Sequence, residues 1–405
     1  MNSQACRSIK HTAACILMLS VSLVACKSSN KMAVAKSTDN TTIKFTAKPD
    51  SQWTALFNRQ HGWFGADGIY AIPLNGKDTK SADDDTTMLV FSDSMIGDII
   101  NGKLQPGYVM IHNSVAYVKG TISEKDKIQF KWDSTSIGQP LSVFEPRTPA
   151  TKEGDYYWLG DGFVNTERNN EINLFGHTIR NTKDSVFGFK EVGTTLITIP
   201  AYSRPPFKNL QQIDLPFLND GDEEQFASFG AGVFVNTKKT GIANGDGFVY
   251  VYGVRGKAKH LVAARVKPKD IGNVAEWRYW DGRKWNADMH TIANITDHLS
   301  NELSVTRLQD GRYALVFQVD GIGSAVGLRL GSSPVGPFGP VIKIWECPEI
   351  KLGKNIFTYN AKAHSNFSTP NELLISYNVN SFDFFNDIQK YPDLYRPRFI
   401  RVKVE

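Results

Sequence analysis

Short β-type runs separated by Gly, Asn, Asp and Pro dominate the chain after residue 50, whereas helical periodicity is scarce there. The runs group into five units of similar length with about four runs each, and this repetition constrains the fold more than any other feature. The first unit contains "GIYAIPL", "TMLVFSD", "MIHNSVAYVKG" and "KIQFKW", and the second contains "YYWLGDGFV", "EINLFGHTIR", "SVFGFKEV" and "TTLITIP". The class is therefore predicted to be all-β.

Four-stranded units of this size are typical of propeller blades, which close radially and so protect their edges. We therefore predict a five-bladed β-propeller over residues 51–405. The last unit offers only three strands before Glu405, which would leave one edge unpaired. The run "TTIKFTA", residues 41–47, is expected to supply the missing strand and close the ring. A sandwich of two sheets fits the same pattern and stays open.

The N-terminal segment has the pattern of a bacterial signal peptide. Two basic residues precede an apolar run at 13–25 that is too short to span a bilayer. The run ends in "LVAC", which resembles a lipobox, so Cys26 is expected to be acylated after removal of residues 1–25. Residues 26–50 would form a polar tether. These features predict a protein of the bacterial cell envelope. The expected form is a lipoprotein of the outer membrane that faces the periplasm or the cell surface. Ordinary signal cleavage beside a chance cysteine is the alternative.

Charge and cysteine content exclude several classes of protein. The net charge of +5 falls to about +3 once the two basic residues of the signal are removed, and no basic block suggests nucleic acid. Of four cysteines only Cys347 remains in the folded part, without the spacing of a zinc site. No cofactor is expected. The acidic cluster Asp83–Asp85 reads as a solvated loop, with structural calcium as a weaker alternative.

Two aspartates frame the first hairpin of the first unit. The strand 69–74 runs away from Asp67, and the strand 88–91 returns toward Asp93. Antiparallel pairing puts both carboxylates at one end of the hairpin. Two carboxylates held close together provide the acid and the base or nucleophile that glycosidic cleavage needs. Each aspartate could instead simply close a turn.

Several segments carry a family resemblance that covers nearly the whole chain after the tether. "GWFGADGIYAIPL", "LVFSDSMIGD", "IHNSVAYV", "SSPVGPFGP" and "AKAHSNFSTPNELLISYNVNS" resemble secreted bacterial five-bladed propellers related to glycoside hydrolases, some of which are endo-acting D-arabinan hydrolases. In such proteins Gly-x-Asp-Gly and Phe-x-Asp supply the paired catalytic aspartates, which implies Asp67 and Asp93 here. The more distant family 43 arabinases and xylosidases add a third acid from a later blade.

Two later acids are candidates for that third carboxylate. Asp161 in "YYWLGDGFV" repeats the Gly-Asp-Gly pattern, although a structural turn fits equally well. Glu302 in "NELSVTRL" opens a core strand and could be an acid, a group that hydrogen bonds to substrate or an exposed strand start, of which the last is favoured. Trp63 could stack on a sugar ring, and guanidinium groups suit hydroxyl-rich ligands. The residues predicted to contact substrate, each with a structural alternative, are Trp63, His112, Asn113, His364, Arg396 and Arg398.

These patterns predict a lipid-anchored glycoside hydrolase that binds carbohydrate and cleaves it with Asp67 and Asp93. The membrane would be reached through the lipid alone. A surface protein that binds glycans without cleaving them, and a scaffold of the cell envelope, are the two alternatives.

Overall fold

The computed structural model describes residues 39–120, 127–183, 188–216, 224–369 and 371–405. The predicted signal peptide and Cys26 lie outside the described residues. The all-β prediction is confirmed, because the two α-helices, α1 (Ser51–Leu56) and α2 (Phe384–Lys390), are short and strands form the rest of the framework. None of the helices in the described ranges is long and apolar enough to cross a membrane.

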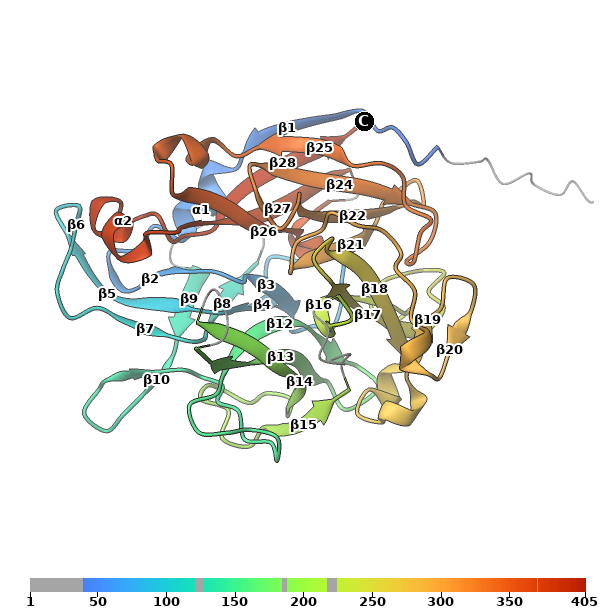
Figure 1. Cartoon of the computed structure of the whole chain (residues 1–405), viewed down its shortest axis with the longest axis horizontal. Coiled ribbons are helices and arrows are strands. Elements are labelled where there is room, and N and C mark those ends of the chain that lie inside the picture. The colour runs from blue at the N-terminus through green and yellow to red at the C-terminus, as the bar shows by residue number, and fades with distance from the viewer. Residues whose placement is uncertain (1–38, 121–126, 184–187, 217–223, 370) are drawn as a thin grey trace, which may run out of the picture. The chain divides into compact units, whose positions relative to one another are not determined.

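The described residues form seven antiparallel sheets, and five of these follow one another along the chain (Figure 1). The first sheet comprises β3 (Tyr70–Pro73), β4 (Thr86–Phe91), β8 (Ser114–Lys119) and β9 (Ile128–Lys131). The second comprises β12 (Tyr156–Asn165), β13 (Glu171–Asn181), β14 (Phe189–Ile199) and β15 (Gln211–Leu215). The third comprises β16 (Ala227–Asn236), β17 (Phe248–Arg255), β18 (His260–Val266), β19 (Arg278–Trp280) and β20 (Trp285–Asn286).

The fourth and fifth sheets complete the series. The fourth comprises β21 (Leu303–Arg307), β22 (Tyr313–Gln318), β24 (Ala325–Gly331) and β25 (Ile342–Glu346). The fifth comprises β1 (Phe45–Pro49), β28 (Arg398–Val404), β27 (Glu372–Ser381), β26 (Ile356–Ala363) and β23 (Ile322–Gly323), in that order across the sheet. β1 pairs along its whole length with β28, from Phe45 opposite Val404 to Pro49 opposite Ile400. The first and last strands of the described chain therefore share one sheet, and β1 overlaps the strand predicted at 41–47.

The other described elements are two further sheets and short 3₁₀ helices. β2 (His61–Ala66) pairs with β5 (Ser94–Ile100), which also pairs with β6 (Lys103–Leu104) and β7 (Val109–Ile111). β10 (Asp133–Ser134) pairs with β11 (Pro140–Leu141). Short 3₁₀ helices occupy Pro268–Asp270, Val274–Glu276, Met289–Thr291, Pro348–Leu352 and Ser365–Phe367.

One strand of each of the five sheets packs against a strand of the next sheet at a common centre. β3 contacts β12, β12 contacts β16, β16 contacts β21, and β21 contacts β26. Figure 1 shows these five strands gathered in the middle of the sheets. Residues on these strands and in the links that precede them, far apart in sequence, are thereby brought together, and the candidate site lies there.

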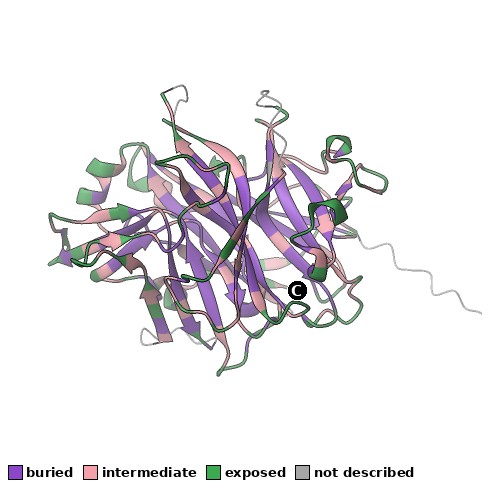
Figure 2. Ribbon diagram, turned by 90° about the horizontal axis from the view of Figure 1, so that it is seen from below, coloured by how far each residue is buried: buried purple, intermediate pink, exposed green. Residues whose placement is uncertain are grey.

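The core is divided among the interfaces between sheets. Five clusters of buried apolar side chains lie between the first and second, second and third, third and fourth, fourth and fifth, and fifth and first sheets. Figure 2 shows the buried residues along the strands and the exposed ones mainly in the connections. Burial of each large apolar side chain stabilises the fold by about 1.5–3 kcal/mol. Many such side chains therefore stabilise every interface. Cys347 belongs to one of these clusters, where burial raises the pKa of its thiol to about 12.

Candidate active site

Asp67 and Asp93 lie in two short links whose backbones are hydrogen bonded to each other. The Asp67 N–H donates to the carbonyl of Asp93 over 3.3 Å, and the Ser92 N–H donates to the carbonyl of Asp67 over 3.0 Å. Gly68 has φ +60°, and a Cβ there would lie 2.7 Å from the Ser92 hydroxyl, so glycine is needed at this crossing. The prediction that the two aspartates share one end of the first hairpin is confirmed.

The side chain of Asp67 is partly buried and held by a tyrosine of the fifth sheet. The Tyr359 hydroxyl donates a hydrogen bond of 2.6 Å to Asp67 Oδ2. Asp67 Oδ1 is closed off from solvent, and the buried Tyr395 is a second side-chain partner of this carboxyl. Burial, followed by the negative charge of Asp93, raises the pKa of Asp67 to about 7. Asp67 is therefore mostly protonated below about pH 7, unlike an ordinary aspartate.

Asp93 lies in a more open environment beside a histidine. Its carboxylate is 3.1 Å from His112 Nδ1, and the two side chains are 17% and 38% exposed. The His112 ring stacks on Tyr156 with 3.7 Å between the ring centres and 14° between their planes. The stack fixes the imidazole against the carboxylate. The two aspartates thus differ in exposure and in hydrogen-bond partners, which is how one fold gives an acid and a base separate tasks.

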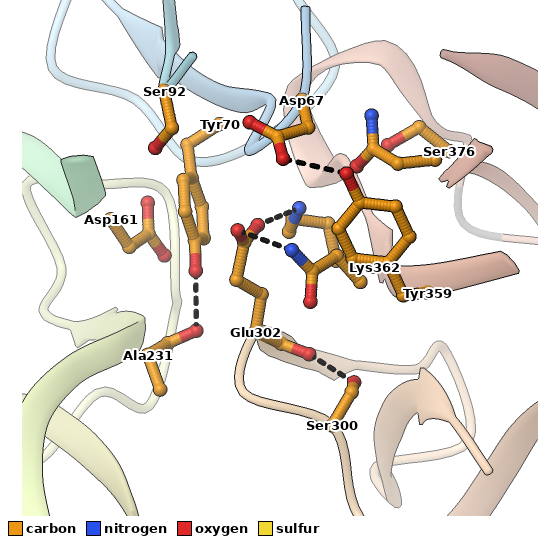
Figure 3. Close-up of polar contacts among 12 residues, drawn as sticks. Asp67, Tyr70, Ser92, Asp161, Ala231, Ser300, Glu302, Tyr359, Lys362 and Ser376 are labelled. Carbon is orange, nitrogen blue, oxygen red and sulfur yellow. Dashed lines mark hydrogen bonds and ion pairs between the residues drawn. The ribbon is translucent and has the colours of Figure 1, made fainter. Parts of the chain in front are cut away.

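Glu302 belongs to the same constellation. It lies in the link before β21, and the Cβ position of Gly68 is 3.2 Å from Glu302 Oε1. Asn360 donates a 2.7 Å hydrogen bond to Oε1, and Lys362 forms an ion pair with Oε2. Lys362 is only 1% exposed, and its ammonium group lies 4.5 Å from the centre of the Tyr70 ring. Figure 3 shows these groups converging on the space beside Asp67.

Asp161 reaches the centre through an irregularity in β12. The register with β13 shifts between Leu159 and Gly162, and the Asp161 carboxylate accepts hydrogen bonds from Gly162 N–H at 2.8 Å and Val233 N–H at 2.7 Å. Burial raises the pKa of Asp161 to about 7, although both backbone donors oppose this. Because both oxygens are engaged by backbone, Asp161 links the second sheet to the third.

A cavity of about 50 Å³ lies beside Asp161 and Lys362, and His364 and Asp78 also line it. Ser365 donates a hydrogen bond to Asp78, and His364 Nε2 is 2.7 Å from the Ser376 hydroxyl. Burial, followed by the charge of Lys362, lowers the pKa of His364 to about 3. His364 is 4% exposed and its ring is engaged by Ser376, so the prediction that it contacts substrate is corrected.

Two further predicted contacts belong to the core instead. Trp63 is 1% exposed and stacks on Phe130 with 4.1 Å between ring centres, so it is not available to a sugar. Asn113 is fully buried and exchanges hydrogen bonds with the backbone of Phe144. These predictions are corrected, because both side chains are buried in the core and so cannot reach a ligand.

The arginines of the closing segment are also structural. Arg396 is 4% exposed and donates to the carbonyls of Phe64 and Arg59 and to Asn58 Oδ1. Arg398 donates to the carbonyls of Arg396 and Asp393 and pairs with Glu349 at 3.4 Å. Both guanidinium groups therefore tie the last strand to its surroundings. Of the predicted contacts, His112 alone lies beside an acid of the pair.

Three residues of the site were not identified from the sequence. Tyr359, Asn360 and Lys362 follow one another in "TYNAKA" on β26. A lysine between two alanines of a strand is a signal for a buried ion pair, because an unpaired ammonium there would be costly. The sequence alone did not identify Glu302 as its partner. The acidic cluster Asp83–Asp85 lies in the connection between β3 and β4, and the described residues contain no group of three or more acidic, His or Cys side chains suited to a metal ion.

Comparisons with other proteins extend over the same part of the chain. A family model described as a domain of unknown function, DUF5005, matches residues 50–404. A structure from Bacteroides ovatus, described as a candidate hydrolase, is 21% identical, with a TM-score of 0.68 over 91% of this chain and 92% of that chain. This similarity shows a shared fold. Comparison with curated protein sequences gave no match.

Two enzymes show a weaker likeness. One is a GH43_1 enzyme from Xanthomonas citri in complex with xylose, which is 14% identical with a TM-score of 0.43 over 88% of this chain and 93% of that chain. The other is a GH62 hydrolase in complex with xylotriose, which is 10% identical with a TM-score of 0.45 over 89% and 97% of the two chains. Both TM-scores are below 0.5, so the assignment of the fold rests on the Bacteroides ovatus structure.

Proposed function

The chain belongs to the family described as domain of unknown function DUF5005, and we propose that this member hydrolyses glycosidic bonds in a polysaccharide or oligosaccharide. The observation that carries the proposal is the acid pair. Asp67 and Asp93 are joined by backbone hydrogen bonds. The Asp67 carboxyl is enclosed and has a pKa of about 7, whereas the Asp93 carboxylate lies beside His112, whose side chain is 38% exposed. Such a division suits an acid and a base or nucleophile.

We assign the proton donor to Asp67. Its raised pKa keeps a proton on the carboxyl near neutral pH, and that proton passes to the leaving oxygen as the bond from the anomeric carbon to this oxygen breaks. Asp93 either takes a proton from the water that attacks the same carbon or bonds to it first and is released by water. In both routes one water is consumed. Its hydroxyl group bonds to the anomeric carbon, and its remaining proton returns the acid pair to its starting protonation state.

Glu302 supports this assignment. Its negative charge helps to raise the pKa of Asp67, although less than burial and Asp93 do. Lys362 and Asn360 hold the Glu302 carboxylate in place. We propose that Glu302 is a positioning residue, whose effect on the reaction passes through the proton affinity of Asp67.

We propose that the five sheets form a five-bladed propeller closed by β1. The five apolar clusters support this arrangement, because they lie between consecutive sheets and also between the fifth and the first. The pairing of β1 with β28 covers an edge that would otherwise remain open.

Turnover is the direct test of the proposed function. The domain spanning residues 39–405 is incubated with neutral plant, algal, host and bacterial-envelope glycans, arabinans among them, and new reducing ends are counted. We expect at least one glycan to be cleaved, with an Asp67→Asn/Asp93→Asn protein as the inactive control. Binding without new reducing ends from any member would support the alternative of a glycan-binding protein and overturn hydrolysis.

We also propose that Cys26 carries a lipid that holds the protein at the bacterial envelope. In bacteria fed a clickable palmitate analogue, the full chain is expected to be labelled and to fractionate with membranes. A Cys26→Ser chain is expected to lose both properties, with Cys347→Ser as the matched control. Labelling that persists in Cys26→Ser would contradict the proposal.

A further inference from the structure

Partly exposed aromatic side chains extend from the acid pair over the fifth sheet. Phe357 and Tyr359 stand two residues apart on β26 and so share a face, with 5.4 Å between their ring centres. Phe382 follows the end of β27 and lies 4.6 Å from Phe357 by ring centres. Tyr359 is hydrogen bonded to Asp67, and Phe382 is 64% exposed. We name Phe357, Tyr359 and Phe382 the β26 arm.

A second group extends from the other acid over the second sheet. His112 contacts Asp93 and stacks on Tyr156, and Tyr156 lies 6.3 Å from Trp158 by ring centres. Tyr156 and Trp158 share a face at the beginning of β12, and both are partly exposed. We name His112, Tyr156 and Trp158 the β12 arm. His112 and Tyr156 also line an open groove of about 520 Å³.

The two arms meet at the acid pair. The β26 arm ends at Asp67 and the β12 arm ends at Asp93, and these two residues are joined by backbone hydrogen bonds. Ile356 at the beginning of β26 pairs with Ser381, which places Phe382 at that end of the fifth sheet, and Tyr359 lies further along β26 opposite Asn378. A path of aromatic rings therefore crosses the acids from one sheet to another.

Aromatic rings that remain partly open, with a polar groove beside His112 and Tyr156 of the β12 arm, suit a flat, partly apolar ligand with many hydroxyl groups. Sugar rings present apolar C–H faces, which pack on aromatic faces, and hydroxyls at their rims. Asn380 lies next to the β26 arm, and its amide nitrogen donates a hydrogen bond of 3.3 Å to the Tyr359 hydroxyl. A groove of 520 Å³ falls in the range of about 300–1,000 Å³ found for ligand pockets, which is enough for more than one sugar unit.

The groove lining carries charges of both signs, with Arg147 and Lys152 on one side of the balance and Glu145, Glu153 and Asp155 on the other. Arg147 and Glu145 are 3.1 Å apart, and Arg180 donates two hydrogen bonds of 2.7 and 2.6 Å to Asp155. These arginines are therefore engaged and do not select an acidic ligand. The chemistry favours an uncharged glycan.

We propose that the β26 arm and the β12 arm bind sugar units on opposite sides of the bond that is cleaved, so that the site takes an extended neutral glycan. This inference rests on the proposed function for the position of the cleaved bond. The arms themselves are binding surfaces and can be measured without turnover.

Binding is measured by calorimetry on the Asp93→Asn protein with arabino-, xylo-, galacto- and gluco-oligosaccharides from disaccharide to octasaccharide. We expect the affinity for at least one series to rise with chain length and then level off. Phe382→Ala and Tyr156→Ala are each expected to weaken binding of the longer members by about tenfold and to leave the disaccharide unchanged. Tyr202→Ala, which removes a tyrosine that is 94% exposed and belongs to neither arm, is the control.

The outcomes separate this inference from the proposed function. Affinity that does not depend on chain length, the absence of binding throughout the panel, or unaltered binding by both alanine variants overturns the inference. Cleavage by the wild-type protein together with such a result would uphold hydrolysis alone. Length-dependent binding that both variants reduce upholds the two arms, even if the wild-type protein cleaves nothing. Thermal unfolding of each variant checks that Tyr156→Ala, whose side chain is partly buried, is folded.

Discussion

Replacing Asp67 by asparagine is expected to lower the rate of glycan hydrolysis by about 10²–10⁴-fold, the range that general acid catalysis contributes. Asparagine keeps the size of the side chain and can still accept the hydrogen bond from Tyr359, but it has no proton to give to the leaving oxygen. The measurement is the initial rate on the best glycan of the panel. A rate within threefold of wild type, roughly 0.6 kcal/mol, would remove Asp67 from the mechanism.

The same variant is expected to be more stable than wild type at alkaline pH. The pKa of Asp67 is raised to about 7, so the folded protein holds a proton that the unfolded chain has already lost. The free energy of unfolding therefore falls as the pH rises from about 4 to about 7, and stays lowered above that. Asp67→Asn abolishes this fall. We expect a gain of about 2–4 kcal/mol near pH 8 and almost none near pH 4.

A loss of rate combined with a gain in stability excludes misfolding as the cause. Asp98→Asn is the control, because the Asp98 carboxylate also accepts a side-chain hydrogen bond, from His61 at 3.0 Å, but that pair is open to solvent. Exposed pairs contribute about 0–1 kcal/mol, so this variant is expected to change neither the rate nor the pH dependence of stability. An equal loss of rate in Asp98→Asn would point to a general effect of charge rather than to Asp67.

The acid pair could be predicted from the sequence because it depends on local geometry. Asp67 and Asp93 lie at the ends of two strands joined by one hairpin, and antiparallel pairing alone brings such residues together. The grouping of short strands into units likewise reflects a local repetition of strand and turn. Both features need only neighbouring residues in the chain.

Contacts between distant strands could not be predicted in this way. Tyr359 and Asp67 are separated by 292 positions, and their hydrogen bond exists only because the fifth sheet lies beside the first. Burial is equally non-local. Trp63 precedes the acid in the chain, yet its ring turns into the apolar cluster between the fifth and first sheets. Arg396 resembles a ligand-binding residue until the carbonyls that engage its guanidinium group are known.

Glu302→Gln and Lys362→Met are each expected to lower the free energy of unfolding by about 3–5 kcal/mol, because each leaves the other member of a buried ion pair without its partner. The double variant is expected to recover most of the loss, since neither charge then remains. Urea unfolding measures all four proteins of the cycle. Glu372→Gln is the control, because Glu372 lies 3.5 Å from Arg401 in a more exposed pair and should cost less than about 1 kcal/mol.

The pH profile of activity distinguishes a positioning role of Glu302 from a purely structural one. The charge of Glu302 contributes to the raised pKa of Asp67, so Glu302→Gln lowers that pKa. Asp67 must be protonated to act as the acid, and the alkaline limb of the profile is therefore expected to move to lower pH. A structural role would reduce the amount of folded enzyme without moving this limb. If the limb stays in place while stability falls, Glu302 supports the fold alone, and the proton affinity of Asp67 must come from burial and Asp93.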